Sequence, residues 1–384
     1  MKRQFIIFFS IVLTIYAVIH WYIFLRGWNA FALLSEYRGW ILAAGILLAS
    51  AFPVGRILER FTLSLFSEVI VYIGAVWLAE MVYLFLFIAL VDILRVINFF
   101  IPFFPSFIVQ HYQQTSLWAG VIVLSLSSLI TAGGFINARF PRIKILHLAT
   151  PGKNSSQKEL NIAVVSDIHL GTIMGKNRLG YIVDKINSLN PDIVLLPGDV
   201  FDEDIGKVIK NNLGEILRTI KSKYGTYAVT GNHEYFGDAE QAVAYLRAHD
   251  ITVLRDEAVN ISDVVTVIGR EDVSSRSMNG KHRKSLQDIL SSAQHHLPTI
   301  VLDHQPFHLE EPAETNIDLQ LSGHTHHGQL WPFNFITNRV YEVSWGYKKK
   351  MNTHIYVSCG AGSWGPPVRT GNRPEIVNVR LRFV

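Results

Sequence analysis

Long apolar stretches fill the first third of the chain, and polar residues interrupt the remainder much more often. A helix needs about 20 mostly apolar residues to cross a bilayer. We therefore expect membrane-spanning helices at four stretches, about Phe5 to Leu25, Gly39 to Val54, Glu68 to Leu94 and Leu117 to Ile136. The aromatic segment from Asn98 to Val109 is too short to span, and we assign it to the membrane interface or to a re-entrant loop.

The first apolar stretch follows Lys2 and Arg3, as the apolar part of a secretory signal peptide would. Its apolar run is longer than the roughly 7–15 residues of such a signal, and no small-residue cleavage site follows it. The pattern therefore favours a retained helix and a multi-pass membrane protein.

After a short polar segment, brief β-rich runs alternate with amphipathic segments, which is the pattern of an α/β domain. Strands are expected at Asn161–Ser166, Asp192–Leu196, Thr226–Val229, Val264–Ile268, Thr299–Leu302, Asp318–Leu321, His354–Ser358 and Glu375–Arg382. Helices are expected at Asn177–Leu189, Ile205–Lys221, Asp238–His249 and Lys284–Gln294. The predicted organisation is a helical transmembrane domain over residues 1–140, a basic polar linker over 141–158 and an α/β domain over 159–384.

Composition agrees with this division. Hydrophobic residues make up 49% of the chain, and the mean hydropathy of +0.24 is high for a soluble protein. The net charge is only +4, and basic residues gather just after the last apolar stretch, so we interpret them as juxtamembrane charge and predict no nucleic-acid partner. Cys359 is the single cysteine, which excludes an intrachain disulfide and a cysteine-based zinc site.

Four crossings would put the N-terminus and the α/β domain on the same side of the membrane. Basic residues are more frequent on that side, and the positive-inside rule then favours the cytoplasmic face of a cell membrane. Glu68 and Glu80 lie in or beside the third apolar stretch. An acid in a membrane helix can mark an ion path. We favour the interpretation that these two acids lie near a helix end or face a neighbouring helix.

Metal-binding side chains follow five of the predicted strands. They are Asp167 and His169, then Asp199 and Asp202, then Asn232 and His233, then His304, and finally His324 and His326. In an open α/β sheet, the carboxyl ends of the strands converge on one crevice. Residues far apart in the sequence are therefore expected to share one site.

The residue types indicate the chemistry of that site. Imidazole combined with carboxylate oxygen suits Mn²⁺, Fe²⁺ or Zn²⁺. Even seven ligands from this set are too many for one ion, but with a bridging carboxylate they fit two ions about 3.5–4 Å apart. Such a pair of ions binds the attacking and leaving oxygens of a phosphoryl displacement and makes a bridging water acidic. Singly, each motif is more often an ordinary turn or helix cap. Five in order favour phosphate ester hydrolysis.

The runs SDIH, GDVFD, GNHE, LDH and GHTH resemble, in order and content, the motifs of calcineurin-like metallophosphoesterases. The resemblance extends from about Asn161 to the C-terminus. The closing GAGSWGPPVRTGNRPEI looks like the branch whose bacterial members are membrane-bound or exported. The resemblance as a whole implies a metallophosphoesterase β-sandwich flanked by helices over residues 159–384.

The resemblance also implies roles for single residues. The first metal would be held by Asp167, His169, Asp199 and His326, and the second by Asp199 as bridge with Asn232, His304 and His324. His233 would stabilise the transition state or protonate the leaving oxygen, and Asp202 would orient His169 from outside the ligand set. Glu234 stands where the family more often has Asp, and its role stays open. Arg369 is a candidate for contact with a substrate phosphate.

Three functions are compatible with these residues. The favoured one is a membrane-bound hydrolase of phosphate monoesters, diesters or pyrophosphates that uses a metal-bridging hydroxide. Its substrate would be a phosphate ester, and one option is a lipid-linked compound such as UDP-diacylglucosamine, which similar proteins of the family cleave in lipid A synthesis. The alternatives are a transporter or regulatory membrane protein, in which the helices act, and a non-catalytic metal-bound scaffold. Scaffolds usually lose ligands or the catalytic His, and here none is missing.

Overall fold

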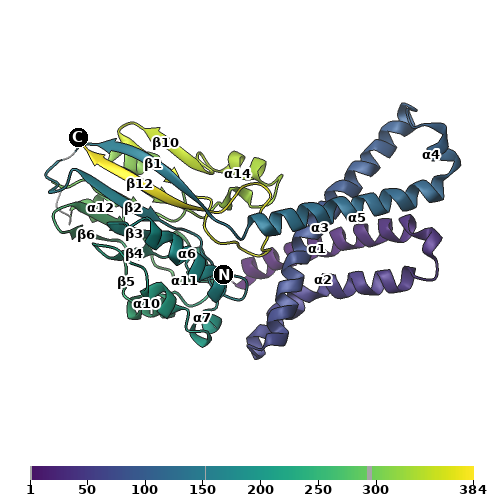
Figure 1. Ribbon diagram of the computed structural model, residues 1–384, viewed down its shortest axis with the longest axis horizontal. Helices are drawn as coiled ribbons and strands as arrows, with labels where there is room; N and C mark the ends of the chain where they lie inside the picture. The colour runs from purple at the N-terminus through teal and green to yellow at the C-terminus, as the bar shows by residue number, and fades with distance from the viewer. Residues whose placement is uncertain (1, 152, 292–295) are drawn as a thin grey trace. The chain divides into compact units, whose positions relative to one another are not determined.

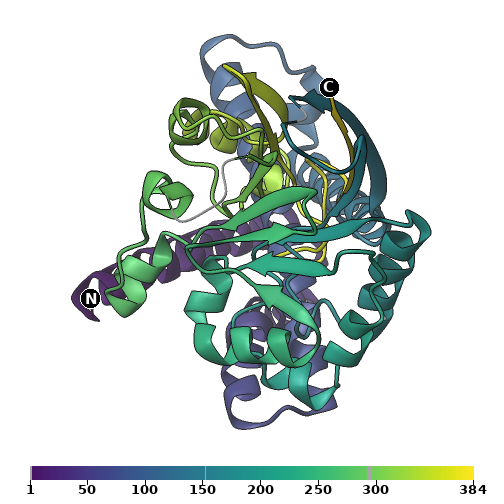
Figure 2. The same cartoon turned by 90° about the vertical axis from the view of Figure 1, so that its left-hand side faces the viewer.

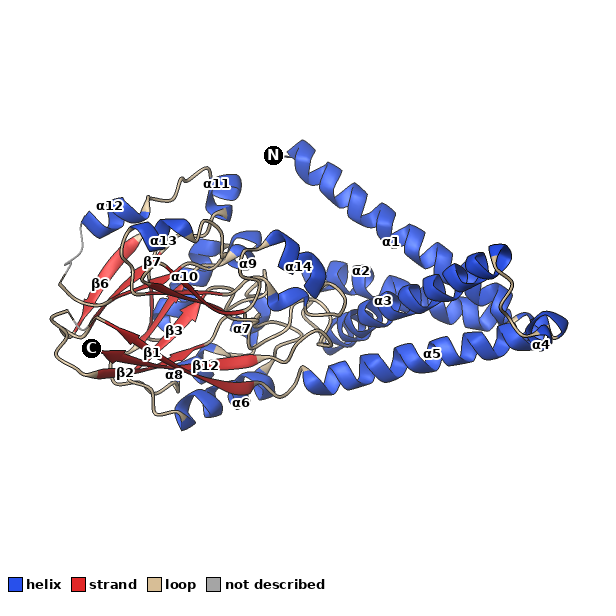
Figure 3. Ribbon diagram, turned by 90° about the horizontal axis from the view of Figure 1, so that it is seen from above, coloured by secondary structure: helices blue, strands red, loops and turns tan. Residues whose placement is uncertain are grey.

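The computed structural model describes residues 2–151, 153–291 and 296–384. The chain divides into two compact units. One comprises Met1–Phe135 with Gly365–Val368, and the other comprises Ile136–Trp364 with Arg369–Val384. Figure 3 shows that the first consists of helices, whereas the strands of the described chain belong to the second.

The helical unit is made of long helices joined by short connections (Figure 1). Its elements are α1 (Lys2–Ala30), the 3₁₀ turn η1 (Ala32–Leu34), α2 (Arg38–Phe61), α3 (Leu65–Phe100), α4 (Ser106–Gln110) and α5 (Tyr112–Asn137). Within the described residues, four of these helices, α1, α2, α3 and α5, are long and apolar enough to cross a membrane. Helices of sufficient length and apolar content therefore lie at all four predicted stretches, and each helix extends beyond its apolar stretch.

Glycines allow α2 and α3 to approach closely. A Cβ atom on Gly74 would lie 2.2 Å from the backbone nitrogen of Phe52, and one on Gly55 would lie 2.8 Å from the backbone nitrogen of Val71. Small residues are common at such crossings because helices in lipid associate through close backbone packing.

The two acids of the third span have ordinary structural positions. Glu68 lies in the first turn of α3. Glu80 is buried, and its carboxylate accepts hydrogen bonds from the hydroxyls of Ser127 at 2.6 Å and Ser128 at 3.1 Å, both on α5. The interpretation that these acids lie near a helix end or face a neighbouring helix is confirmed.

The strands of the second unit form, over the described residues, two six-stranded mixed sheets. The first contains, in order across it, β1 (Arg142–Thr150), β12 (Glu375–Phe383), β2 (Glu159–Val164), β3 (Ile193–Pro197), β4 (Thr226–Val229) and β5 (Ile251–Val253). The second contains β10 (Gly346–Lys350), β11 (Thr353–Val357), β9 (Leu319–Ser322), β8 (Thr299–Leu302), β7 (Val265–Gly269) and β6 (Glu257–Ile261). Strands β2 to β5 are parallel to one another, as are β7, β8, β9 and β11.

The sheets pack face to face, and helices cover their outer faces (Figure 2). Between the sheets, Ile162 of β2 and Leu195 of β3 belong to one buried cluster with Val267 of β7 and Ile300 of β8. On the outer face of the first sheet lie α6 (Lys176–Ser188), α8 (Gly214–Arg218) and α10 (Ala239–Ala248), and on that of the second lies α12 (Leu286–Ser291). The expected β-sandwich flanked by helices is therefore confirmed.

The structure adds strands β5, β6 and β10 and several short helices that the sequence did not predict, and it differs at three of the segments that were predicted. Residues 142–150 form β1 rather than a linker, because they pair in parallel with β12 from the end of the chain. The helix expected at Ile205–Lys221 is two short helices, α7 (Gly206–Lys210) and α8, separated by a turn in which Asn212 has a positive φ of 50°. The helix expected at Lys284–Gln294 is described as α12, and residues 292–294 of that prediction lie outside the described residues.

Candidate metal centre and active site

Loops at the carboxyl ends of parallel strands carry the predicted ligands. The loop after β2 supplies Asp167 and His169, and the loop after β3 supplies Asp199 and Asp202. Asn232 and His233 begin α9 (Asn232–Phe236), which follows β4. His304 follows β8, and His324 and His326 follow β9, the latter in the short turn η2 (His326–Gly328). The ligands therefore come from both sheets of the sandwich.

Five of these residues have backbone conformations that side chains other than glycine rarely adopt. The φ angles are 52° at Asp167, 54° at His169, 51° at Asp199, 72° at His324 and 45° at His326. Left-handed conformations at non-glycine residues cost roughly 1–3 kcal/mol each and gather at functional sites. Their coincidence with the ligand set indicates loops shaped for binding rather than for stability.

Glycines of the motifs make room for the carboxylates. A Cβ atom on Gly231 would lie 2.2 Å from Oδ1 of Asp199, and one on Gly323 would lie 2.2 Å from Oδ2 of Asp167. No side chain is tolerated so close to a carboxylate oxygen. The Gly that precedes Asn232 and the Gly that precedes His324 are therefore required by the packing of the site.

One group of potential ligands consists of Asp167, His169 and His326. The Nε2 atoms of His169 and His326 are 2.9 Å apart, and Nε2 of His326 is 3.6 Å from Oδ1 of Asp167. All three side chains are buried. Two imidazole nitrogens and a carboxylate thus point at one small volume.

The second group consists of Asp199, His304 and His324, with Asn232 among them. Nε2 of His304 lies 3.0 Å from Oδ2 of Asp199 and 3.2 Å from Oδ1 of Asn232. Nδ1 of His324 lies 2.7 Å from the same Asn232 oxygen. Because Oδ2 of Asp199 is also 3.8 Å from Nε2 of His169, this carboxylate lies between the two groups.

Burial keeps three of the ligand imidazoles neutral. Burial lowers the pKa of His169 and of His324 to about 3, with help from neighbouring charged imidazoles, and it lowers that of His326 well below its usual value. His304 differs. Burial opposes its protonation, but the charge of Asp199 and the hydrogen bond to it outweigh burial and raise the pKa of His304 well above its usual value. Three imidazoles are thus already in the form that binds metal.

The donor set fits two divalent cations. Oδ2 of Asp167 is buried and has no hydrogen-bond partner, which is costly unless a cation is bound there. Imidazole nitrogens mixed with carboxylate and amide oxygens suit first-row ions such as Mn²⁺, Fe²⁺ and Zn²⁺. The seven predicted ligands thus lie together in two groups that meet at Asp199.

His233 lies beside the ligand groups. Its backbone N–H donates to Oδ1 of Asp199 at 2.9 Å, and its Nδ1 is 3.4 Å from Oδ1 of Asp202. Burial opposes protonation of His233, but the charges of Asp199 and Asp202 and the hydrogen bond to Asp202 raise its pKa to about 9. Asp202 is also 3.9 Å from Nδ1 of His169, so it lies between both imidazoles and closer to His233.

Two further residues support the site in ways that the sequence did not indicate. The carboxylate of Glu234 accepts hydrogen bonds from the backbone N–H groups of Asp199, Phe201 and Gly231, and so ties the loops after β3 and β4 together. Arg369 is fully buried, and its Nη2 lies 2.9 Å from Nδ1 of His326. The sequence suggested that Arg369 contacts a substrate phosphate. Its buried position instead favours a role in orienting His326.

Exposed aromatic side chains border the site. The rings of Phe236 and Trp364 are 5.3 Å and 5.6 Å from that of His233, and about half of each side chain is exposed. Tyr341 lies 6.0 Å from His324. Phe236, Trp364 and Tyr341 therefore form an aromatic border beside the candidate site.

Comparison with known proteins agrees with this geometry. Residues 160–328 match the family model described as calcineurin-like phosphoesterase. An uncharacterized metallophosphoesterase of Campylobacter jejuni is 31% identical over 263 residues, which cover 68% of this chain and 68% of that protein. The chain belongs to the calcineurin-like metallophosphoesterase family. Members of this family generally depend on two metal ions, in agreement with the two ligand groups.

Other metallophosphoesterases are similar to this one. A relative from Helicobacter pylori strain J99, also uncharacterized, is 38% identical over 58% of this chain, but the match spans only 60% of that relative's length. A bovine protein named as a transmembrane protein with a metallophosphoesterase domain is 31% identical over 68% of this chain and 62% of its own. A solved 5′-nucleotidase precursor from Thermus thermophilus has a TM-score of 0.35 at 14% identity, over 59% of this chain and 54% of its own.

Proposed function

We propose that this metallophosphoesterase is a membrane-bound hydrolase of phosphate ester or pyrophosphate bonds. The observation that carries the proposal is the junction at Asp199, where two groups of metal-type ligands meet beside a third imidazole, His233. A site for structure alone would need neither the second group nor His233.

Asp167, His169, Asp199 and His326 would hold the first ion, and Asp199, Asn232, His304 and His324 would hold the second. When bound, two such ions polarise the phosphoryl group and make a water nucleophilic at neutral pH. The protein's part is to place its ligands before the substrate arrives. The buried, mostly neutral imidazoles and the left-handed loops serve this purpose.

His233 would donate a proton to the leaving oxygen. Its raised pKa keeps the imidazole protonated at neutral pH, and Asp202 holds its Nδ1 side, which leaves Nε2 for the substrate. Bound cations would lower this pKa toward neutrality, where proton donors are most effective.

We further propose that the substrate is linked to a lipid. Exposed Phe236 and Trp364 beside His233 offer apolar contacts outside the metal site, and the helices long enough to cross a membrane would keep the enzyme at a bilayer. A nucleotide-linked lipid pyrophosphate such as UDP-diacylglucosamine meets both conditions. The excess of basic residues on one side of the spans supports a catalytic domain at the cytoplasmic face.

The transporter and scaffold functions have less support. Glu80 is hydrogen-bonded to two serines of α5, as expected for an acid that joins helices. The two groups of metal-type ligands and the neighbouring His233 support an enzyme, because a scaffold would need no proton donor.

The substrate proposal is tested by offering the full-length protein, purified in detergent with Mn²⁺, three substrates: UDP-diacylglucosamine, a chromogenic diester and a chromogenic monoester. Hydrolysis should require Asp199, so Asp199→Asn is the control. We expect all metal-dependent turnover to vanish in that variant and the lipid pyrophosphate to be cleaved with the highest kcat/KM. Faster cleavage of a water-soluble ester would overturn the lipid assignment, and no turnover of any substrate by metal-loaded protein would favour the scaffold function.

A further inference from the structure

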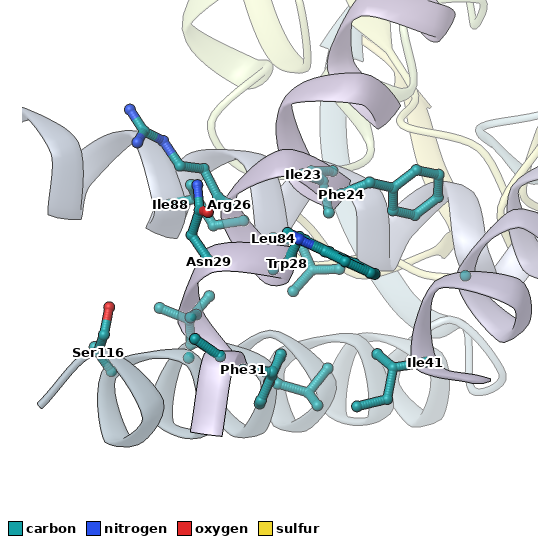
Figure 4. Close-up of a pocket in the computed structure, with 18 of the residues that line it drawn as sticks. Ile23, Phe24, Arg26, Trp28, Asn29, Phe31, Ile41, Leu84, Ile88 and Ser116 are labelled. Carbon is teal, nitrogen blue, oxygen red and sulfur yellow. The ribbon is translucent and has the colours of Figure 1, made fainter. Parts of the chain in front are cut away.

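The helical unit contains a cavity of about 620 Å³, well away in sequence from the metal ligands. It is lined by parts of α1, α2, α3 and α5 (Figure 4), and its walls come entirely from residues 23–124. Ile23, Phe24 and Trp28 of α1, Leu84 of α3 and Ile41 of α2 give it an apolar surface. A cavity of this size in a membrane-type helical unit can hold part of a small amphiphile.

The charged residues of this cavity lie at one end of the helices. Arg26 is close to the end of α1, Arg38 begins α2, and Arg95 lies near the end of α3. Asp92 is the acid among the lining residues. Its carboxylate is already engaged, because Nε of Arg26 lies 2.8 Å and the hydroxyl of Tyr22 2.5 Å from Oδ2. Three arginines against one carboxylate leave an excess of two positive charges.

Arg38 has the least protein contact of the three arginines. Its guanidinium lies 4.6 Å from the ring centre of Trp28, and its Nε is buried without a hydrogen-bond partner. A buried donor without a partner is costly, and a planar guanidinium is well suited to a phosphate group. An anion that bound here would supply the missing acceptor.

The apolar part of the cavity extends away from these charges. Along α3 the lining runs from Asp92 back to Trp77, fifteen residues or about 22 Å at 1.5 Å per residue. That is longer than one leaflet of a hydrocarbon core about 30 Å thick. The cavity therefore combines a cationic end near the helix termini with an apolar part of the length of an acyl chain.

We propose that this cavity binds an anionic phospholipid, with its phosphate at Arg26, Arg38 and Arg95 and an acyl chain along α3. Charge complementarity selects an anionic lipid over a zwitterionic one, and the apolar depth selects a lipid over free phosphate. The cavity shares no residue with the predicted metal ligands, so this proposal does not depend on the proposed hydrolysis. Its occupant is a bound lipid and not a substrate.

Native mass spectrometry of the full-length protein tests this site. The delipidated protein is equilibrated with equal amounts of phosphatidylglycerol and phosphatidylcholine, and the lipid retained per chain is measured. We expect one phosphatidylglycerol in preference to phosphatidylcholine. Arg38→Gln should lower its retention about fivefold, the ratio for the loss of one arginine contact worth about 1 kcal/mol. Arg60→Gln, at the other end of α2, should leave retention unchanged.

A second pair of variants tests whether a side chain that fills the cavity prevents lipid binding. Gly27 lines the cavity, and a Cβ atom there would meet nothing within 4 Å, so Gly27→Leu should extend its side chain into the site and abolish retention. Gly133 has equally open surroundings but does not line the cavity, so Gly133→Leu is the matched control. Equal retention of both lipids, equal effects in variants and controls, or displacement of the lipid by millimolar inorganic phosphate would each overturn the proposal.

Discussion

Oδ1 of Asp202 lies 3.4 Å from Nδ1 of His233, closer than to the imidazole of the expected ligand His169. The charge of Asp202 is among the causes that raise the pKa of His233 to about 9, against the opposing effect of burial and together with the charge of Asp199. Asp202 is therefore placed to control the protonation of the proposed proton donor.

This contact predicts a shift in the pH dependence of turnover. If His233 donates a proton as proposed, kcat should fall as the pH rises through the pKa of its imidazole. Asp202→Asn removes a negative charge that favours protonation, so the alkaline limb of the profile should move to lower pH. The comparison is made on both proteins with the same bound metal. An alkaline limb at the same pH in both would exclude this role for Asp202.

Replacing His233 should separate catalysis from metal binding. We expect His233→Ala to keep two metal ions and to lose turnover by about 10²–10⁴-fold, the usual contribution of a positioned proton donor. The loss should be smaller for substrates whose leaving group needs no proton. His327→Ala is the control, since His327 neighbours a ligand but contacts Ser344 and Trp345. A similar loss in both variants would mean that His233 has no specific role.

Metal affinity should rise with pH. Without metal, His304 is protonated and paired with Asp199 at 3.0 Å, because the charge of Asp199 outweighs burial and raises the pKa of His304. Binding must release that proton, so the dissociation constant for Mn²⁺ should fall about tenfold for each pH unit below this pKa. Isothermal titration of the metal-free protein at pH 6, 7 and 8 measures the slope. Affinity that does not change with pH would contradict the ion pair.

Glu234 should matter for stability. Glu234→Ala would leave the N–H groups of Asp199, Phe201 and Gly231 without their acceptor, at about 1–3 kcal/mol each if they stay buried. We expect the melting temperature of the metal-free protein to fall by roughly 6 °C or more. Glu310→Ala, at an exposed acid of α13 (Glu310–Glu314), should have little effect. Equal melting temperatures for the wild type and Glu234→Ala would show that water replaces the carboxylate.

Eight of the twelve described strands, and the grouping of the candidate ligands, were predictable because they depend on local sequence. Apolar runs end in Asp167, Asp199 or His304, and the carboxyl ends of parallel strands converge whatever the detailed packing. The spans were predictable for a similar reason, since length and apolar content alone decide whether a helix can cross a membrane.

The remaining features depend on contacts between distant residues. Strand β1 pairs with β12 more than 200 positions later, and its Arg142, Lys144 and His147 resemble a basic linker. The position of Asp202 between His169 and His233 follows from loops with left-handed residues. The burial of Arg369 depends on carbonyl groups of the last loop, to which its guanidinium donates. None of these contacts leaves a local pattern.

The most direct test of the account is to count bound ions and measure turnover in the same sample. The full-length protein is stripped of metal and titrated with Mn²⁺, and at each step metal content and hydrolysis of a chromogenic phosphate ester are measured beside Asp199→Asn. The account predicts activity that appears as the second ion binds, at two ions per chain, and none in the variant. Full activity in the stripped protein, or with a single ion per chain, would contradict a two-metal phosphoesterase.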